Sequence, residues 1–96
     1  MDQLTFTNSL KADLPPQTSV YLKALWYDRN DKWKLAHGLV DQLNDPGACW
    51  VHAYLHRKEG DVANADYWYR RAGKKRPAAS LDEEWDQLVN FFLQEG

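Results

Sequence analysis

Residues 50–77 read WVHAYLHRKEGDVANADYWYRRAGKKRP, and this stretch decides the fold. Gly60 interrupts it, and the Asp61 that follows is a residue type that caps helix N-termini. Beyond this cap, apolar side chains recur at the spacing of one helix face: Val62, Ala65, Tyr69 and Ala72. Upstream, Asp45-Pro46 is typical of a helix start. The stretch therefore predicts a hairpin of two helices over residues 46–72.

Helical signals continue on both sides of this hairpin. An earlier pair of helices is predicted over residues 17–43, with apolar residues at i, i+3, i+4 and i+7 in its second helix: Ala36, Leu39, Val40 and Leu43. Ser80 and Glu83 form a capping-box pattern, which predicts a last helix over residues 81–94. We therefore expect a single all-α domain over residues 1–96, with about five helices arranged as two stacked antiparallel hairpins plus a C-terminal helix.

The chain is weakly similar to itself at an offset of 29 residues. Small and apolar residues coincide in the two hairpins, because Ala36 aligns with Ala65 and Val40 aligns with Tyr69. A pattern of this kind is typical of stacked helix pairs, in which each pair buries its apolar face against its neighbour. The sequence therefore favours a small helical repeat.

The stretch from Trp50 onwards resembles a tetratricopeptide-type repeat, and the segment ADYWYRRAG also resembles the end of a Sel1-like repeat. The first resemblance depends on a turn glycine, two alanines, an aromatic residue and a proline: Gly60, Ala65, Tyr69, Ala72 and Pro77. The first helix departs from the motif at four positions: Cys49, His52, Ala53 and His56. The chain is also similar to small bacterial proteins that carry WVHAYLHRKEGD and YWYRRAG. The resemblance implies a fold of stacked helix pairs and assigns no activity.

Composition and charge narrow the function classes. A single cysteine, Cys49, excludes an intramolecular disulfide. The N-terminus lacks the pattern of a signal peptide, and no apolar run approaches the roughly 20 residues of a membrane span, so we expect a cytoplasmic protein without membrane contact. Residues 49–77 hold seven Lys and Arg against three acids, whereas residues 78–96 hold five acids and no base. This arrangement predicts that the basic middle pairs internally with the acidic tail.

One stripe of the helix before Gly60 is polar where the repeat pattern expects apolar residues, at Cys49, His52 and His56. Two imidazoles at i and i+4 with a nearby thiolate could bind one zinc-like ion. The spacing shows no fourth ligand, and His37 or Asp66 could serve only if folding brought them near. On sequence alone we favour a structural role, with hydrogen-bonded histidines and a packed thiol. A cysteine nucleophile is disfavoured because no orienting residue or oxyanion donor is identifiable.

Aromatic residues are unusually frequent, with five Trp, five Tyr and three Phe. Rings and cations interleave, and six residues are predicted to contact a partner: Trp50, Tyr54, Arg57, Tyr67, Trp68 and Arg71. Nucleic acid is disfavoured because the pI is about 5.8. We therefore predict a non-catalytic module, without a cofactor, that binds a protein or peptide or self-associates. The alternatives are a metal-binding or enzymatic protein that uses Cys49, His52 and His56, and a small-molecule pocket lined by Trp and His.

Overall fold

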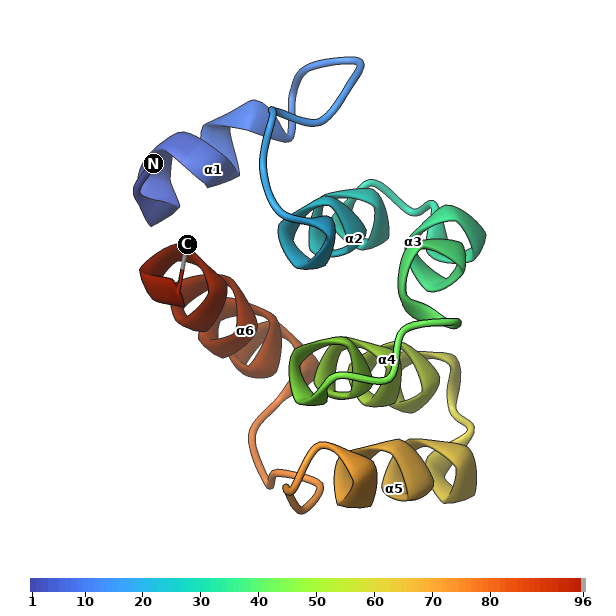
Figure 1. The fold of residues 1–96 in the computed structure, drawn as a ribbon. Coiled ribbons are helices and arrows are strands. Elements are labelled where there is room, and N and C mark those ends of the chain that lie inside the picture. Colours follow the sequence, from blue (N-terminus) through green and yellow to red (C-terminus); the bar gives the residue numbers. More distant parts are fainter. Residues whose placement is uncertain (96) are drawn as a thin grey trace.

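Six helices and no strand make up residues 1–95, the part of the chain that the computed structural model describes (Figure 1). Their bounds are α1 Gln3–Ser9, α2 Val20–Arg29, α3 Trp33–Val40, α4 Pro46–Glu59, α5 Val62–Arg71 and α6 Leu81–Glu95. The predicted all-α class is confirmed. The count is six rather than about five because the N-terminal segment, whose state the sequence leaves open, forms α1 behind the N-cap Asp2. None of these helices combines the length and apolarity needed to cross a membrane.

Most helix starts are set by a side chain that accepts a hydrogen bond from a free backbone N–H. Ser19, Asp45 and Asp61 cap α2, α4 and α5 in this way. At the start of α6, the Ser80 hydroxyl accepts from the Glu83 N–H, and the Glu83 carboxylate accepts from the Ser80 N–H. The capping box read from the sequence is therefore confirmed.

The start of α3 differs from those of the other helices, although Asp31, a residue type that caps helix N-termini, stands just before it. The N-cap is Lys32, and no side chain caps the helix. Asp31 instead adopts a left-handed conformation with φ of 61°, and its N–H donates to the Asp28 carbonyl. Asp tolerates this conformation better than most residues do. The short turn between α2 and α3 therefore uses Asp31 to reverse the chain, which removes it from the capping position.

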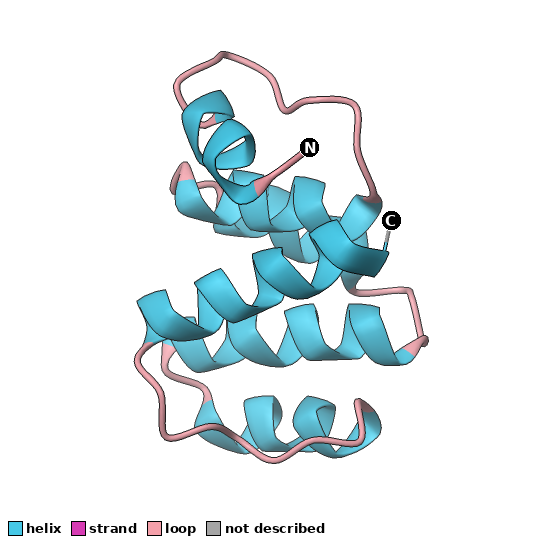
Figure 2. Ribbon diagram, turned by 90° about the vertical axis from the view of Figure 1, so that its left-hand side faces the viewer, coloured by secondary structure: helices cyan, strands magenta, loops and turns pink. Residues whose placement is uncertain are grey.

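Helix α4 lies at the centre of the fold. It contacts α2, α3, α5 and α6, and Figure 1 shows it between the α2–α3 pair and α5. Every residue from Ala48 to His56 is buried, whereas a surface helix buries only one stripe. Figure 2 shows α6 running across α2 and α4, and α1 packs on α6. Side chains on every face of α4 therefore meet a neighbouring helix.

The two predicted hairpins pair α2 with α3 and α4 with α5, which are the closest helix pairs in the fold. Gly60 ends α4 in the left-handed conformation, with φ of 94°, where a glycine has no steric penalty. Ala65 is fully buried in the second pair and lets α5 approach α4 closely. The resemblance to a tetratricopeptide repeat stays a prediction.

A buried carboxylate joins three helices at the centre of the fold. Glu84 on α6 has no exposed surface and accepts hydrogen bonds from the Tyr69 hydroxyl at 2.7 Å and the Trp50 Nε1 at 3.2 Å. It also pairs with Arg57, whose Nη1 lies 2.8 Å away. Burial and then the carboxylate raise the pKa of Tyr69, so its hydroxyl stays protonated and can donate. At this pair, the predicted pairing of the basic middle with the acidic tail is confirmed.

A second buried carboxylate ties α2 to α4. Asp28 is 1% exposed and accepts from the Tyr54 hydroxyl at 3.1 Å and from the Lys58 Nζ at 2.9 Å. Burial, followed by the Asp28 charge, raises the pKa of Tyr54. Both carboxylates thus have hydrogen-bonding partners on α4, as buried charges require.

Candidate metal centre

The three histidines of the chain meet where α3 packs on α4. His37 belongs to α3, whereas His52 and His56 lie one turn apart on α4. One potential ligand nitrogen of each ring lies within 4.8 Å of the other two. The Nε2 atoms of His37 and His52 are 3.0 Å apart. We call these three residues the histidine cluster.

Two tryptophans hold the histidine cluster in place. Trp33 opens α3, and its Nε1 donates to the Leu55 carbonyl on α4 at 2.8 Å, which fastens the two helices together. Its ring stacks on His37 with the centroids 4.8 Å apart. Trp68 on α5 stacks on His52 with the centroids 3.9 Å apart. The imidazoles are therefore positioned by packing from both neighbouring helices, as a binding site requires.

Burial disfavours the charged form of two members of the cluster, His37 and His52. His52 and His56 are 4% and 7% exposed, and His37 is half-buried. Burial, followed by the neighbouring His37 and His56, lowers the pKa of His52 to about 4. Burial also lowers the pKa of His37. Neutral imidazoles bind metal ions, whereas protonated ones do not.

His52 has an unmet hydrogen-bonding requirement. Its Nε2 contacts His37, but its Nδ1 is buried without any hydrogen-bond partner among the described residues. A neutral imidazole presents one donor and one acceptor, and leaving either buried and unpaired costs about 1–3 kcal/mol. A purely structural histidine would be expected to satisfy both nitrogens. The Nδ1 of His52 is therefore a buried polar atom that costs stability, and binding of an ion through Nε2 would not satisfy it.

A carboxylate lies near the Nδ1 atom of His56 and another near that of His37. The Nδ1 of His56 lies 2.6 Å from a Glu59 carboxylate oxygen, and the Nδ1 of His37 lies 3.9 Å from Asp41. A carboxylate within hydrogen-bond distance, as Glu59 is, orients a metal-binding histidine and makes it more basic, whereas Asp41 is too far from His37 for a hydrogen bond. His56, Glu59 and Asp61 also form a second group whose potential ligand atoms lie within 4.8 Å of one another.

The spacing of the histidine cluster fits a small tetrahedral ion. Two nitrogens that each lie about 2.0–2.1 Å from zinc are about 3.3 Å from one another in tetrahedral geometry. The His37 and His52 Nε2 atoms, at 3.0 Å, are already close to this separation. The His56 nitrogen lies within 4.8 Å, so a shift of about 1–2 Å would bring it to the same spacing. Imidazole ligands suit zinc, copper and nickel.

Of the ligands considered from the sequence, the structure brings His37, His52 and His56 together and leaves two others apart. Cys49 is not part of the cluster. Its Sγ lies 3.6 Å from the Asn44 carbonyl, and burial raises the pKa of the thiol. Asp66 pairs with Arg76 at 3.4 Å. The sequence pointed to His37 only conditionally, and a stronger signal was the Trp33–His37 spacing, which places both rings on one face of α3.

The six residues predicted to contact a partner divide into two groups. Trp50 and Tyr54 are buried, and Arg57 is held by Glu84, so these three contribute to the interior of the fold. The other three, Tyr67, Trp68 and Arg71, form a cluster on α5. The Arg71 guanidinium lies 5.0 Å from the centroid of the Trp68 ring and 5.8 Å from that of the Tyr67 ring.

Acid is expected to destabilise the metal-free chain through His52. The pKa of His52 falls from 6.5 to about 4 on folding, so the unfolded chain binds more protons between these values. The stabilisation is complete above about pH 6.5 and is lost as the pH falls toward 4. We expect urea denaturation in EDTA to show a loss of about 2 kcal/mol between about pH 7 and pH 5. A smaller loss is expected for His52→Gln, and equal slopes for both proteins would contradict the prediction.

Comparison with known proteins adds no assignment, because no family model, curated protein or solved structure matches this chain. The resemblance to tetratricopeptide and Sel1-like repeats is therefore not tested by a relative. The chemistry of the histidine cluster is the main guide to function.

Proposed function

We propose that the chain binds a transition-metal ion of the zinc type through His37, His52 and His56. The observation that supports this proposal is that three imidazoles converge from two helices, with one potential ligand nitrogen of each ring within 4.8 Å of the other two. This proposal develops the metal-binding alternative seen in the sequence and replaces Cys49 with His37 in the ligand set.

The proposed ion would connect α3 to α4. α3 is only eight residues long and has no side-chain N-cap, so it depends on tertiary contacts for stability. His37 would contribute one ligand from α3, and His52 and His56 would contribute two from α4. Three protein ligands leave a further coordination position for water or a small ligand, which is the pattern of zinc sites that are not purely structural.

Metal titration of the tag-free chain, stripped with EDTA and dialysed, tests the proposal. Isothermal titration with ZnCl₂ is expected to give one ion per chain. At a free ion concentration about 100 times the Kd, the free energy of unfolding should rise by about 2.7 kcal/mol. Co²⁺ serves as a spectroscopic probe, because its visible absorption reports tetrahedral coordination. Absence of saturable binding for both ions would overturn the proposal.

Variants separate the histidine cluster from the ligand set predicted by sequence. His37→Ala changes a half-buried side chain, so the fold should persist. The zinc affinity should fall by more than roughly 10–100-fold, which is the loss expected when a carboxylate that orients a ligand is removed. Glu59→Gln is expected to lower the zinc affinity by roughly 10–100-fold. Cys49→Ala is the matched control and should leave the affinity unchanged. Loss of binding in Cys49→Ala, with binding retained in His37→Ala, would contradict the assignment.

A further inference from the structure

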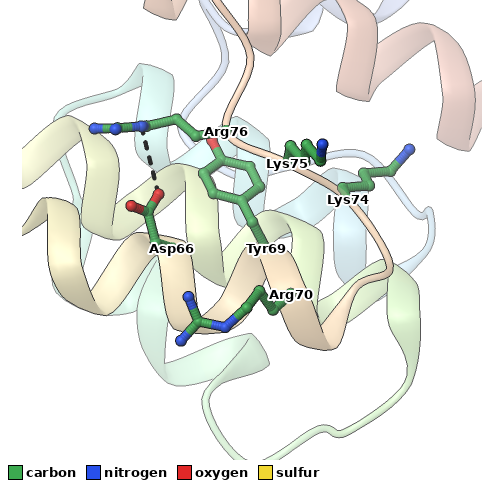
Figure 3. A pocket seen from close by; sticks show the side chains of 6 residues that line it. All are labelled: Asp66, Tyr69, Arg70, Lys74, Lys75 and Arg76. Carbon is green, nitrogen blue, oxygen red and sulfur yellow. Dashed lines mark ion pairs between the residues drawn. The ribbon is translucent and has the colours of Figure 1, made fainter.

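A group of cations surrounds a surface cavity between α5 and the segment that follows it. The cavity has a volume of about 270 Å³ and is lined by Asp66, Tyr69, Arg70, Lys74, Lys75 and Arg76. Figure 3 shows Tyr69 between the helix and the segment, with Arg76 and Asp66 on one side, Lys74 on the other and Arg70 below. Four of the six lining residues are cationic and one is anionic.

Most of these cations have no carboxylate partner. Arg57 and Lys58, which lie elsewhere in the basic region, pair with buried carboxylates, and within the cavity lining Arg76 pairs with Asp66. Among the described residues, Arg70, Lys74 and Lys75 form no ion pair. We call these three the cationic rim. The Lys74 Nζ lies 4.1 Å from the centroid of the Trp50 ring, which leaves its charge uncompensated while fixing its position.

The segment beside the cationic rim also offers free backbone donors. Residues 74–80 form no helix, and Figure 2 shows the segment after α5 passing along that helix. The backbone N–H groups of Lys75, Arg76 and Ala78 donate no hydrogen bond to another described residue. All three residues are exposed. An extended peptide could therefore supply carbonyl acceptors to this segment as well as charges to the rim.

We propose that the cationic rim and residues 75–79 bind an extended acidic segment of a partner protein. The cationic groups are spread around the cavity rather than aimed at one point, so they suit several separated carboxylates better than one small anion. The free backbone donors suit a peptide backbone.

The surroundings of the rim disfavour a nucleic acid. The chain carries a net charge of −2, and the first turn of α6 follows directly with exposed Asp82 and Glu83. These acids would repel a continuous phosphate backbone that extended past the rim, whereas a short acidic peptide can end before reaching them. This proposal gives the interaction module predicted from the sequence a defined binding surface and an acidic partner. It does not depend on metal binding.

Fluorescence anisotropy tests the proposal on the full chain in EDTA. The probe is a fluorescein-labelled peptide of about ten residues that alternates Glu and Gly, titrated at low salt, where exposed charges are least screened. Saturable binding that weakens as salt is added is expected. A Lys–Gly peptide of the same length should not bind, and a single-stranded oligonucleotide of equal charge should bind more weakly than the Glu–Gly peptide.

Two charge-matched variants locate the surface. The double variant R70E/K75E is expected to weaken peptide binding about tenfold or more, because it reverses two charges of the rim. The double variant K11E/K34E makes the same change of net charge at exposed lysines elsewhere and should alter affinity less than about twofold. Matching thermal melts would show that both variants fold. Equal weakening in both variants, tighter binding of the oligonucleotide, or no saturable peptide binding would each overturn the proposal.

Discussion

Glu84→Ala is expected to lower the free energy of unfolding by about 3–5 kcal/mol, which is the cost of removing one partner from a buried ion pair. The Glu84 carboxylate has no exposed surface and accepts hydrogen bonds from Tyr69 and Trp50 while pairing with Arg57. Its removal leaves the partly buried Arg57 guanidinium with the Ala79 carbonyl as its remaining acceptor and leaves two further donors unpaired. Because small domains have free energies of unfolding of about 5–15 kcal/mol, this loss is a large share of the total, and urea denaturation should show a clearly lower midpoint.

Two further variants show that the buried charge, rather than α6 itself, causes this loss. Glu84→Gln keeps the shape and one acceptor oxygen but leaves Arg57 without a counter-charge, so an intermediate loss of about 1.5–3 kcal/mol is expected. Asp86→Ala removes an exposed carboxylate two residues along the same helix and should change stability by less than about 0.5 kcal/mol. Equal losses in Glu84→Ala and Asp86→Ala would contradict the prediction.

Trp85→Ala is expected to cost about 3–5 kcal/mol through loss of packing between α6 and the rest of the fold. Trp85 is 2% exposed, and its ring lies 6.0 Å from the Phe6 ring, so it contacts α1 as well as α2. Its Nε1 donates to the Leu25 carbonyl at 3.1 Å, and the Arg29 guanidinium covers its face at 4.1 Å. Chemical denaturation followed by circular dichroism measures the loss.

A conservative variant separates the volume of Trp85 from its hydrogen bond. Trp85→Phe keeps an aromatic ring but removes the donor, and we expect a loss of about 1–2 kcal/mol. Phe91→Ala truncates a neighbour on the same helix that is 42% exposed, so its cost should be below about 1.5 kcal/mol. If Trp85→Phe cost as much as Trp85→Ala, volume would not be the main contribution and the prediction would be wrong.

Two of the three residues of the candidate metal centre could be predicted from local sequence. His52 and His56 are four residues apart on one helix, and helical geometry places such residues on one face whatever surrounds them. His37 is 15 residues before His52 in the chain, so its contact depends on how α3 docks on α4. Cys49 lies one turn before His52, but a helical wheel does not show that its thiol points to the Asn44 carbonyl.

The same limit applies to the residues predicted to contact a partner. Trp50, Tyr54 and Arg57 share a stripe on α4 that the sequence presents as available. The structure covers that stripe, because α2 brings Asp28 to Tyr54 and α6 brings Glu84 to Trp50 and Arg57. Nothing in the local pattern of α4 specifies these neighbours, so burial of the stripe required the tertiary structure.

The sequence alone determined the all-α class, the hairpin around Gly60 and the capping box at Ser80, because caps, turn glycines and apolar periodicity act over a few residues. Only the tertiary structure decided that the polar stripe of the hairpin's first helix meets His37, that Glu84 is buried and that the cationic rim forms no ion pair within residues 1–95. The first two features join residues 15 or more positions apart in the chain. Their contacts depend on which helix faces pack together, and the packing that gives the whole core its lowest free energy determines those faces.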